Sequence, residues 1–160
     1  MKKIFSVLTL LIFGVMSCGK KDNGEKKLRV GLNAIFAPFE YVENGKITGF
    51  DVDMINEIGK NLGYKIEIID QSFDGLIPSL KAGKIDAIIL EKAVATEYMK
   101  KNPEMEIFDE KPASIGMAMA IDKGKNPELI KQINAELKKM RENGKYDELI
   151  KKYGLENSQK

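Results

Sequence analysis

The chain has 160 residues, 43% hydrophobic and 31% charged, which is typical of one globular domain rather than of a disordered chain. It contains no histidine, which excludes histidine-dependent nucleophile systems and histidine-rich metal sites, and we predict neither a metal nor a cofactor. The formal charge of +2 is accounted for by Lys2 and Lys3, and the remainder balances 24 basic against 24 acidic residues. This balance gives no support to nucleic-acid binding.

The amino-terminal segment is predicted to direct export. Lys2 and Lys3 precede an uncharged apolar run, residues 4–16, which is shorter than the ~20 residues of a membrane span and suits a signal-peptide core. The run ends before Ser17-Cys18-Gly19, which resembles the lipobox of bacterial lipoproteins. We expect residues 1–17 to be a leader, Cys18 to be lipid-modified, and residues 18–27 to be the lipidated tether. A buried structural cysteine is the alternative.

The rest of the chain alternates strand and helix patterns. Apolar residues three and four apart from Val52 to Leu62 predict a helix that Gly63 stops, and Asn126-Pro127 opens another. The strands are expected near 28–32, 65–69, 85–90, 106–108 and 115–121, and the other helices near 72–82, 92–101 and 146–153. Gly45 indicates a turn. This alternation predicts an α/β fold with a mostly parallel sheet flanked by helices, which binds ligands at the carboxyl ends of its strands.

The stretch 28–89 resembles the first lobe of amino-acid-binding proteins of ABC importers (solute-binding protein family 3, periplasmic binding protein type 2). The resemblance rests on Phe36-Ala37-Pro38-Phe39-Glu40-Tyr41 followed by Gly49-Phe50-Asp51-Val52-Asp53. Residues 90–152 resemble the family's carboxyl-terminal part in three stretches, AVATEYMKKNP, IGMAMAIDKGKNPEL and the closing ENGKYDELIKKYG. The domain is therefore expected to span 28–160, with 28–89 from the first lobe and 90–160 from the end of the second lobe and the carboxyl-terminal helices.

The chain departs from the family pattern after Gly83-Lys84-Ile85-Asp86-Ala87. In the family an arginine that clamps the ligand's carboxylate follows, and a second lobe comes next. Here no arginine occurs between Arg29 and Arg141. We therefore expect a single periplasmic-binding-protein-like lobe that lacks part of the first lobe's end and most of the second lobe.

The resemblance implies four ligand-binding positions. Asn33 and Phe36 match the family's first-strand loop, and Phe73 matches an aromatic residue that faces the ligand across the pocket. Glu91 lies where the family has the carboxylate that binds the ligand's amine, although an ordinary acid at a helix start is an equal alternative. Core packing is the alternative for Phe36 and Phe73.

Three further residues of the motif receive structural interpretations. Phe39 is expected to be a core residue. Asp51 and Asp53 could be taken for paired catalytic acids, but a helix cap and a solvated helix face explain them better.

The function expected from the resemblance is an extracytoplasmic lipoprotein that binds a polar amino acid and delivers it to an inner-membrane ABC permease. We expect no enzymatic activity and a location in the periplasm or on the outer face of the cytoplasmic membrane. A dehydratase-like enzyme on the same fold and a truncated, non-binding product are the alternatives. Binding by the single lobe is expected to be weak, and a homodimer would be one way to close the pocket.

Overall fold

A computed structural model of the chain describes residues 26–91, 100–101, 105–108, 117–122 and 124–156. Cys18 and most of the predicted helix over 92–101 lie outside the described residues. The described strands and helices are, in chain order, β1 (Lys26–Leu32), β2 (Ile35–Phe36), β3 (Glu40–Glu43), β4 (Lys46–Thr48), α1 (Phe50–Leu62), β5 (Tyr64–Asp70), α2 (Phe73–Lys81), β6 (Ala87–Glu91), β7 (Met105–Phe108), β8 (Met117–Asp122), α4 (Pro127–Glu142) and α5 (Lys145–Lys152).

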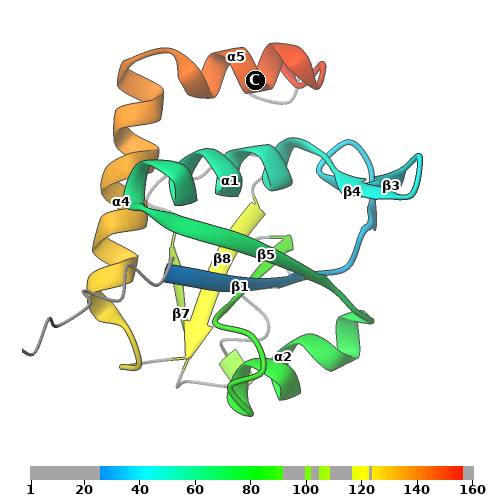
Figure 1. Cartoon of the computed structure of the whole chain (residues 1–160), viewed down its shortest axis with the longest axis vertical. Coiled ribbons are helices and arrows are strands. Elements are labelled where there is room, and N and C mark those ends of the chain that lie inside the picture. Colours follow the sequence, from blue (N-terminus) through cyan, green and yellow to red (C-terminus); the bar gives the residue numbers. More distant parts are fainter. Residues whose placement is uncertain (1–25, 92–99, 102–104, 109–116, 123, 157–160) are drawn as a thin grey trace, which may run out of the picture.

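The main sheet has the order β5-β1-β6-β8-β7, with β1 at the centre of its parallel part (Figure 1). β1 pairs in parallel with β5 and with β6, whereas β8 runs antiparallel to both of its neighbours. Four of the five strands therefore share one direction. The prediction of one lobe with a mostly parallel sheet is confirmed, since β6 and β8 join the sheet that β1 begins.

Both faces of the sheet are covered, and the side chains of each strand alternate between the two faces. In β1, Leu28, Val30 and Leu32 belong to the larger core, which α1, α4 and α5 cover. In β6, Ile88 and Leu90 belong to a second core against α2, on the opposite side of the sheet (Figure 1). Strands covered on both faces are expected to be apolar throughout, which explains the continuous run in β6.

A second, three-stranded sheet with the order β2-β3-β4 was not predicted. Asn44 and Gly45, both with positive φ, join β3 to β4 as a two-residue hairpin turn, for which the Asn-Gly pair is well suited. The turn at Gly45 is thus confirmed. The strands around it have two to four residues each, too few for a clear alternating pattern.

Helix ends follow the predicted signals. Gly63 adopts the left-handed conformation after α1, with its N–H bonded to the last turn. Pro127 occupies the first turn of α4, and the side chain of Asn126 accepts a hydrogen bond from the Leu129 N–H at 3.2 Å. The helices bounded in this way, α1 and α4, pack together with α5 in the larger core.

An ion pair between Arg29 and Asp86 holds β1 to the loop before β6. The guanidinium donates from Nε and Nη2 to the two carboxylate oxygens, at 2.9 and 2.7 Å, and the Arg29 N–H donates to the same group at 2.9 Å. Burial acts to raise the pKa of Asp86, but the hydrogen bonds from Arg29 outweigh it and lower that pKa. The pair therefore stabilises the fold above the usual pKa of an aspartate, and this contribution is lost as the pH falls through the lowered value.

We predict that Arg29→Ala lowers the free energy of unfolding by roughly 1.5–3 kcal/mol, the usual contribution of hydrogen bonds to a charged group. Lys27→Ala is the matched control on the same strand, because Lys27 forms an exposed pair with Glu67 and such pairs contribute roughly 0–1 kcal/mol. Urea unfolding at neutral pH measures both variants. Equal losses for the two would contradict the prediction.

Candidate ligand site

The carboxyl ends of three neighbouring parallel strands meet at one edge of the main sheet. β1 ends at Leu32, β5 at Asp70 and β6 at Glu91. We call residues 33–36, residues 70–75 and Glu91 the carboxyl edge. In open α/β sheets this is the edge where ligands bind.

Hydrogen bonds tie the two loops of the carboxyl edge together. The Asn33 side chain donates from Nδ2 to the backbone oxygen of Gln71 at 3.2 Å, and the Ala34 N–H donates to Asp70 Oδ1 at 2.9 Å. The Gln71 N–H donates to the backbone oxygen of Leu32 at 3.1 Å. Asn33 therefore lies at the carboxyl edge and holds the loop after β1 on the loop after β5, while its contact with a ligand stays a prediction.

Gln71 is a residue of this edge that the sequence did not single out. Its Oε1 accepts a hydrogen bond from the Ser79 hydroxyl at 3.0 Å. Its Nε2 is buried and has no acceptor among the described residues. Only its place after a strand could have drawn attention to it, because glutamine is common in polar loops.

The two predicted aromatic residues lie in different surroundings. Phe36 is 45% exposed and stacks on Phe39, with ring centroids 5.5 Å apart. Phe73, in the first turn of α2, is half-buried and packs against the smaller core. Phe39 is buried in the larger core, as predicted. Phe36 therefore presents part of its ring to solvent, while Phe73 is partly a core residue.

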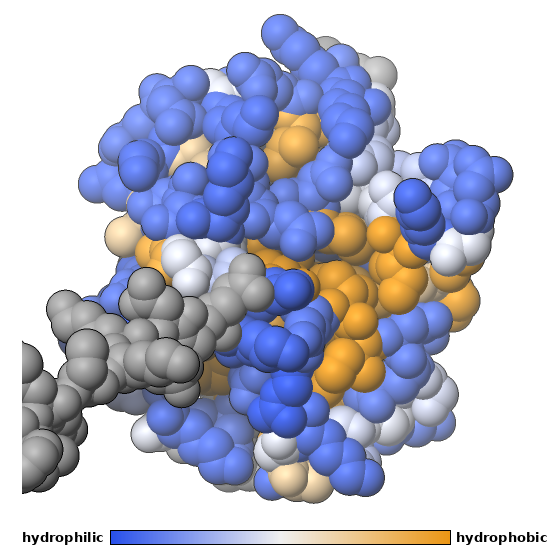
Figure 2. All heavy atoms as spheres, viewed as in Figure 1, coloured by the Kyte–Doolittle hydropathy of each residue, from blue (hydrophilic) through white to orange (hydrophobic). Residues whose placement is uncertain are grey.

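Hydrophobic side chains gather on the surface beside this edge. Figure 2 shows an apolar patch on this face of the molecule, which lies over β5 and extends toward the small sheet. Ile35, Phe36 and Val42 are large hydrophobic residues of the small sheet that stay exposed. Exposed apolar clusters of this kind often mark binding surfaces.

The carboxyl edge is acidic. The loop residues 33–36 and 70–75 include Asp70 and Asp74, both exposed, and no lysine or arginine. Glu91 adds a third acid as the last residue of β6, where it pairs with Met117 of β8; its side chain lies outside the described part of the structure. The edge is therefore better suited to a cation than to an anion.

Neither arginine of the chain offers a carboxylate clamp at this edge. Arg29 is bound to Asp86. Arg141 stacks on the ring of Tyr146, with its guanidinium carbon 5.0 Å from the ring centroid. This agrees with the sequence, which has no arginine at the family's clamp position.

The predicted roles of Asp51 and Asp53 are wrong. Asp51 is fully buried beside Glu40, and α1 begins after Gly49 without a side-chain cap. Asp53 accepts hydrogen bonds from the Tyr153 hydroxyl, at 2.7 Å, and from Lys152. The sequence near Asp51 and Asp53 predicted a helix cap and a solvated helix face. In the structure β3 and α5 pack against α1 and cover that face.

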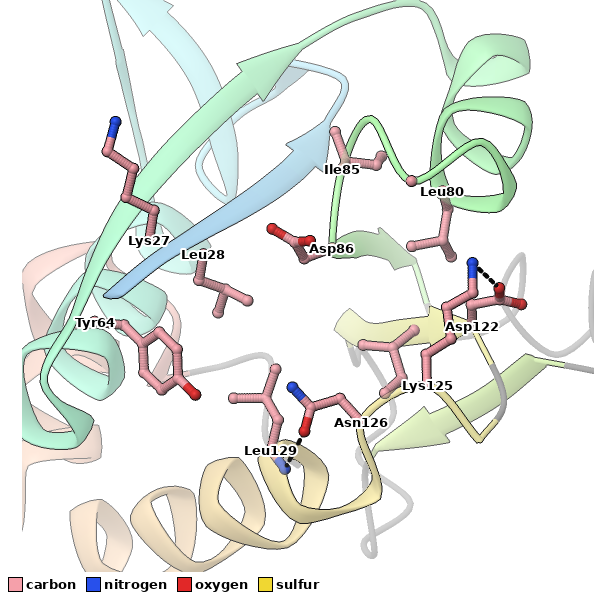
Figure 3. A pocket seen from close by; sticks show the side chains of 12 residues that line it. Lys27, Leu28, Tyr64, Leu80, Ile85, Asp86, Asp122, Lys125, Asn126 and Leu129 are labelled. Carbon is pink, nitrogen blue, oxygen red and sulfur yellow. Dashed lines mark hydrogen bonds and ion pairs between the residues drawn. The ribbon is translucent and has the colours of Figure 1, made fainter. Parts of the chain in front are cut away.

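A cavity of about 310 Å³ lies at the opposite edge of the sheet, near the amino ends of β1 and β5 (Figure 3). Its apolar walls include Leu28 and Leu129. Asp122 pairs with Lys125 at 2.7 Å, and Asp86 is held by Arg29. Because its acidic groups already have partners within the chain, the cavity has no evident ligand role.

Among the described residues, none of the helices combines the length and the apolar content that a membrane span requires. The same part of the chain contains no group of three or more cysteine, aspartate or glutamate side chains placed to hold a metal ion.

Known proteins resemble this chain in sequence and in fold. The arginine-binding extracellular protein ArtP of Bacillus subtilis is 32% identical over 114 residues, covering 68% of this chain and 45% of ArtP. A probable histidine-binding protein of Campylobacter jejuni is 37% identical, covering 54% of this chain and 38% of that protein. The chain thus spans less than half the length of these curated relatives.

A solved structure of one domain matches more completely. The arginine-bound form of domain 1 from TmArgBP is 38% identical, with a TM-score of 0.59, covering 71% of this chain and 92% of that chain. The family described as bacterial extracellular solute-binding proteins, family 3, matches residues 28–156. On this evidence the chain belongs to the bacterial extracellular solute-binding proteins, family 3.

Proposed function

We propose that this chain binds an amino acid with a cationic side chain at the carboxyl edge and delivers it to an ABC permease. The observation that carries the proposal is the composition of that edge, which combines the rings of Phe36 and Phe73 with acidic residues and has no lysine or arginine in its described loops. A guanidinium or ammonium group over an aromatic ring gains roughly 0.5–2 kcal/mol. Carboxylates bind the same groups through charge-assisted hydrogen bonds.

The comparisons support the same class of ligand. Two relatives are named for binding arginine and histidine, and a matching single domain was solved in an arginine-bound form. The family is one of solute-binding proteins rather than of enzymes, which disfavours the dehydratase alternative. Asn33, Phe36, Phe73 and Glu91 remain the residues we propose for ligand contact.

The affinity of one copy should be modest. A hydrogen bond to a charged group contributes roughly 1.5–3 kcal/mol, so the absence of the carboxylate clamp costs about one to two powers of ten in affinity. Tight binding would require a second chain over the carboxyl edge, and two copies can meet there with twofold symmetry. The exposed Ile35 and Val42 beside this edge would support such a contact.

We predict that residues 26–160 bind arginine or lysine with a Kd weaker than roughly 1 µM and bind glutamate more weakly still, since the edge is acidic. Phe73→Ala should weaken arginine binding by roughly 3- to 30-fold through the lost ring contact. Ile130→Ala is the control, because Ile130 is a half-buried hydrophobic residue of α4 that packs against the larger core and is not part of the carboxyl edge. Calorimetry with sedimentation measures both affinity and assembly.

Three results would contradict this proposal or the modest affinity expected from it. Stronger binding of glutamate or glutamine than of arginine would exclude a cationic ligand. Absence of binding to all common amino acids would favour a truncated, non-binding product. Micromolar or better affinity of a monomer would show that another group replaces the missing arginine.

We also propose that Cys18 carries a lipid anchor. Lys26 begins β1 at the amino edge of the sheet, so the carboxyl edge is directed away from the anchored end. Residues 19–25 reach at most roughly 25 Å when extended. A lipidated amino terminus would therefore leave the ligand edge accessible from outside the membrane, in the periplasm or on the outer face of the cytoplasmic membrane.

Expression of the full chain in a bacterium tests the anchor. The protein should partition into detergent, with a mass that corresponds to acylation at Cys18 and loss of residues 1–17, because acyl chains contribute about 0.8 kcal/mol per buried methylene. Cys18→Ala should remain uncleaved or become soluble, and Ser6→Ala within the leader is the control. Recovery of unmodified Cys18 in the cytosolic fraction would exclude lipidation.

A further inference from the structure

Two carboxyl groups are buried beside residues 33–39, which we call the Phe36 loop and which include β2. Glu40 is 5% exposed and Asp51 is fully buried, and they are the buried charged residues of the described chain. Glu40 Oε2 and both carboxylate oxygens of Asp51 have no hydrogen-bond partner among the described residues. Each carboxyl shifts the pKa of the other, which indicates that the two groups are neighbours. Two neighbouring carboxyls can form a hydrogen bond only if one of them carries a proton.

The pair lies where the Phe36 loop is fixed to α1. Glu40 is the first residue of β3, directly after this loop, and Asp51 is in the first turn of α1. The N–H groups of Phe50 and Asp51 donate to the backbone oxygens of Pro38 and Phe39, both at 3.0 Å. The loop carbonyls thus bind the free N–H groups at the start of the helix, in place of a side-chain cap.

Gly49 makes this close approach feasible. Its φ is +133°, and a Cβ at this position would lie 2.0 Å from the Phe39 backbone oxygen. Any other residue would therefore push the loop away from α1. The Phe36 ring depends on the same contact, because Phe36 stacks on Phe39 and Phe39 packs edge-on against Phe50.

The electrostatics of the pair favour a retained proton. Burial is the main cause that raises the pKa of Glu40 to about 7. Burial also raises the pKa of Asp51 well above its usual value, with a further contribution from Glu40. Burial and the partner carboxyl are the causes of both shifts. The other titratable groups on the surrounding elements include Glu43 of β3, Lys46 of β4, Asp53 of α1, Tyr146 and Lys152 of α5, and Tyr153 directly after it. Lys152 and Tyr153 are already bound to Asp53.

We propose that Glu40 and Asp51 are positioning residues that share a proton, and that this bond holds the Phe36 loop in the conformation that binds ligand. The proposal rests on the ligand site proposed above. When the proton leaves, two negative charges face each other in a buried site, and their repulsion is relieved by separating the loop from α1. Phe36 then moves away from the carboxyl edge, so ligand affinity falls.

The sign of the pH effect follows from the raised pKa values. A buried acid whose pKa is raised on folding favours the folded, closed state most at low pH, and this contribution is lost as the pH rises from the ordinary carboxyl pKa to the raised pKa. For Glu40 the loss is complete near pH 7, and for Asp51, whose pKa is also raised, it continues at higher pH. Both the thermal stability and the arginine affinity of the native chain should therefore decrease as the pH rises from about 5 to above 7.

The decisive variant is Glu40→Gln. The glutamine amide donates a hydrogen bond to the Asp51 carboxylate at every pH and so replaces the shared proton with a fixed one. The native protein should lose up to about tenfold in arginine affinity per pH unit over the range in which the pair loses its proton, while the affinity of Glu40→Gln should change much less. Glu43→Gln, an exposed acid on the same strand, is the control and should retain the native pH dependence. Asp51→Asn provides the reciprocal substitution if Glu40→Gln folds poorly.

Three measurements test the shared proton and the cationic ligand separately. Calorimetry at each pH gives the affinity profile, thermal unfolding gives the stability profile, and carboxyl NMR reports the protonation of Glu40 and Asp51 directly. A Glu40→Gln profile as steep as that of Glu43→Gln would overturn the positioning role. Titration of both carboxyls below pH 5 would exclude a shared proton. If arginine binds at no pH while the NMR shows a retained proton, the ligand proposal fails and the loop-positioning role fails with it, but the shared proton stands.

Discussion

The parallel pairing of β1 with β5 on one side and β6 on the other is the constraint on which the rest of the structure depends. It brings the carboxyl ends of the three strands, at Leu32, Asp70 and Glu91, to a single edge. Parallel neighbours also require crossover connections. The connection from β1 to β5 contains α1 and the connection from β5 to β6 contains α2, and the two helices lie on opposite faces of the sheet (Figure 1). The close packing is visible at Gly31 of β1, where a Cβ would lie 2.5 Å from Ile85 and 3.1 Å from Leu76. A larger residue there would separate α2 from the sheet and disturb the position of Phe73.

Much of this arrangement could be predicted from the sequence because it depends on local patterns. The helix from Val52 to Leu62 shows its buried face directly in the apolar spacing, and Gly63 and Pro127 carry their boundary signals in their own backbone chemistry. The β6 run is apolar because both of its faces are covered. The three short strands around Gly45 gave no such signal, since two to four residues cannot establish an alternating pattern.

The site was predictable only in part, for a physical reason. Asn33, Phe36 and Phe73 were placed by the family motif, and the structure locates each of them after the end of β1 or β5. Asp51 and Asp53 were misassigned because their surroundings are set by β3 and α5, which are distant in sequence. Aspartate near a helix start usually caps the helix or faces water, and nothing local shows that Glu40 buries Asp51. Gln71 was missed because a buried amide without an acceptor leaves no trace in the sequence pattern.

The two acidic regions of the molecule differ in what their environments allow. Asp70 and Asp74 lie at the exposed carboxyl edge, where water and a cationic ligand can both stabilise a charged carboxylate. Glu40 and Asp51 lie beneath the adjacent loop, where no cation of the described chain contacts them and an ionised pair would be strongly unfavourable. A hydrophobic pair of similar size would stabilise that position more simply. Residues that lower the stability of a fold are expected mainly at positions that serve its function. Glu40 and Asp51 lie between α1 and the Phe36 loop, so the position of Phe36 at the carboxyl edge depends on them.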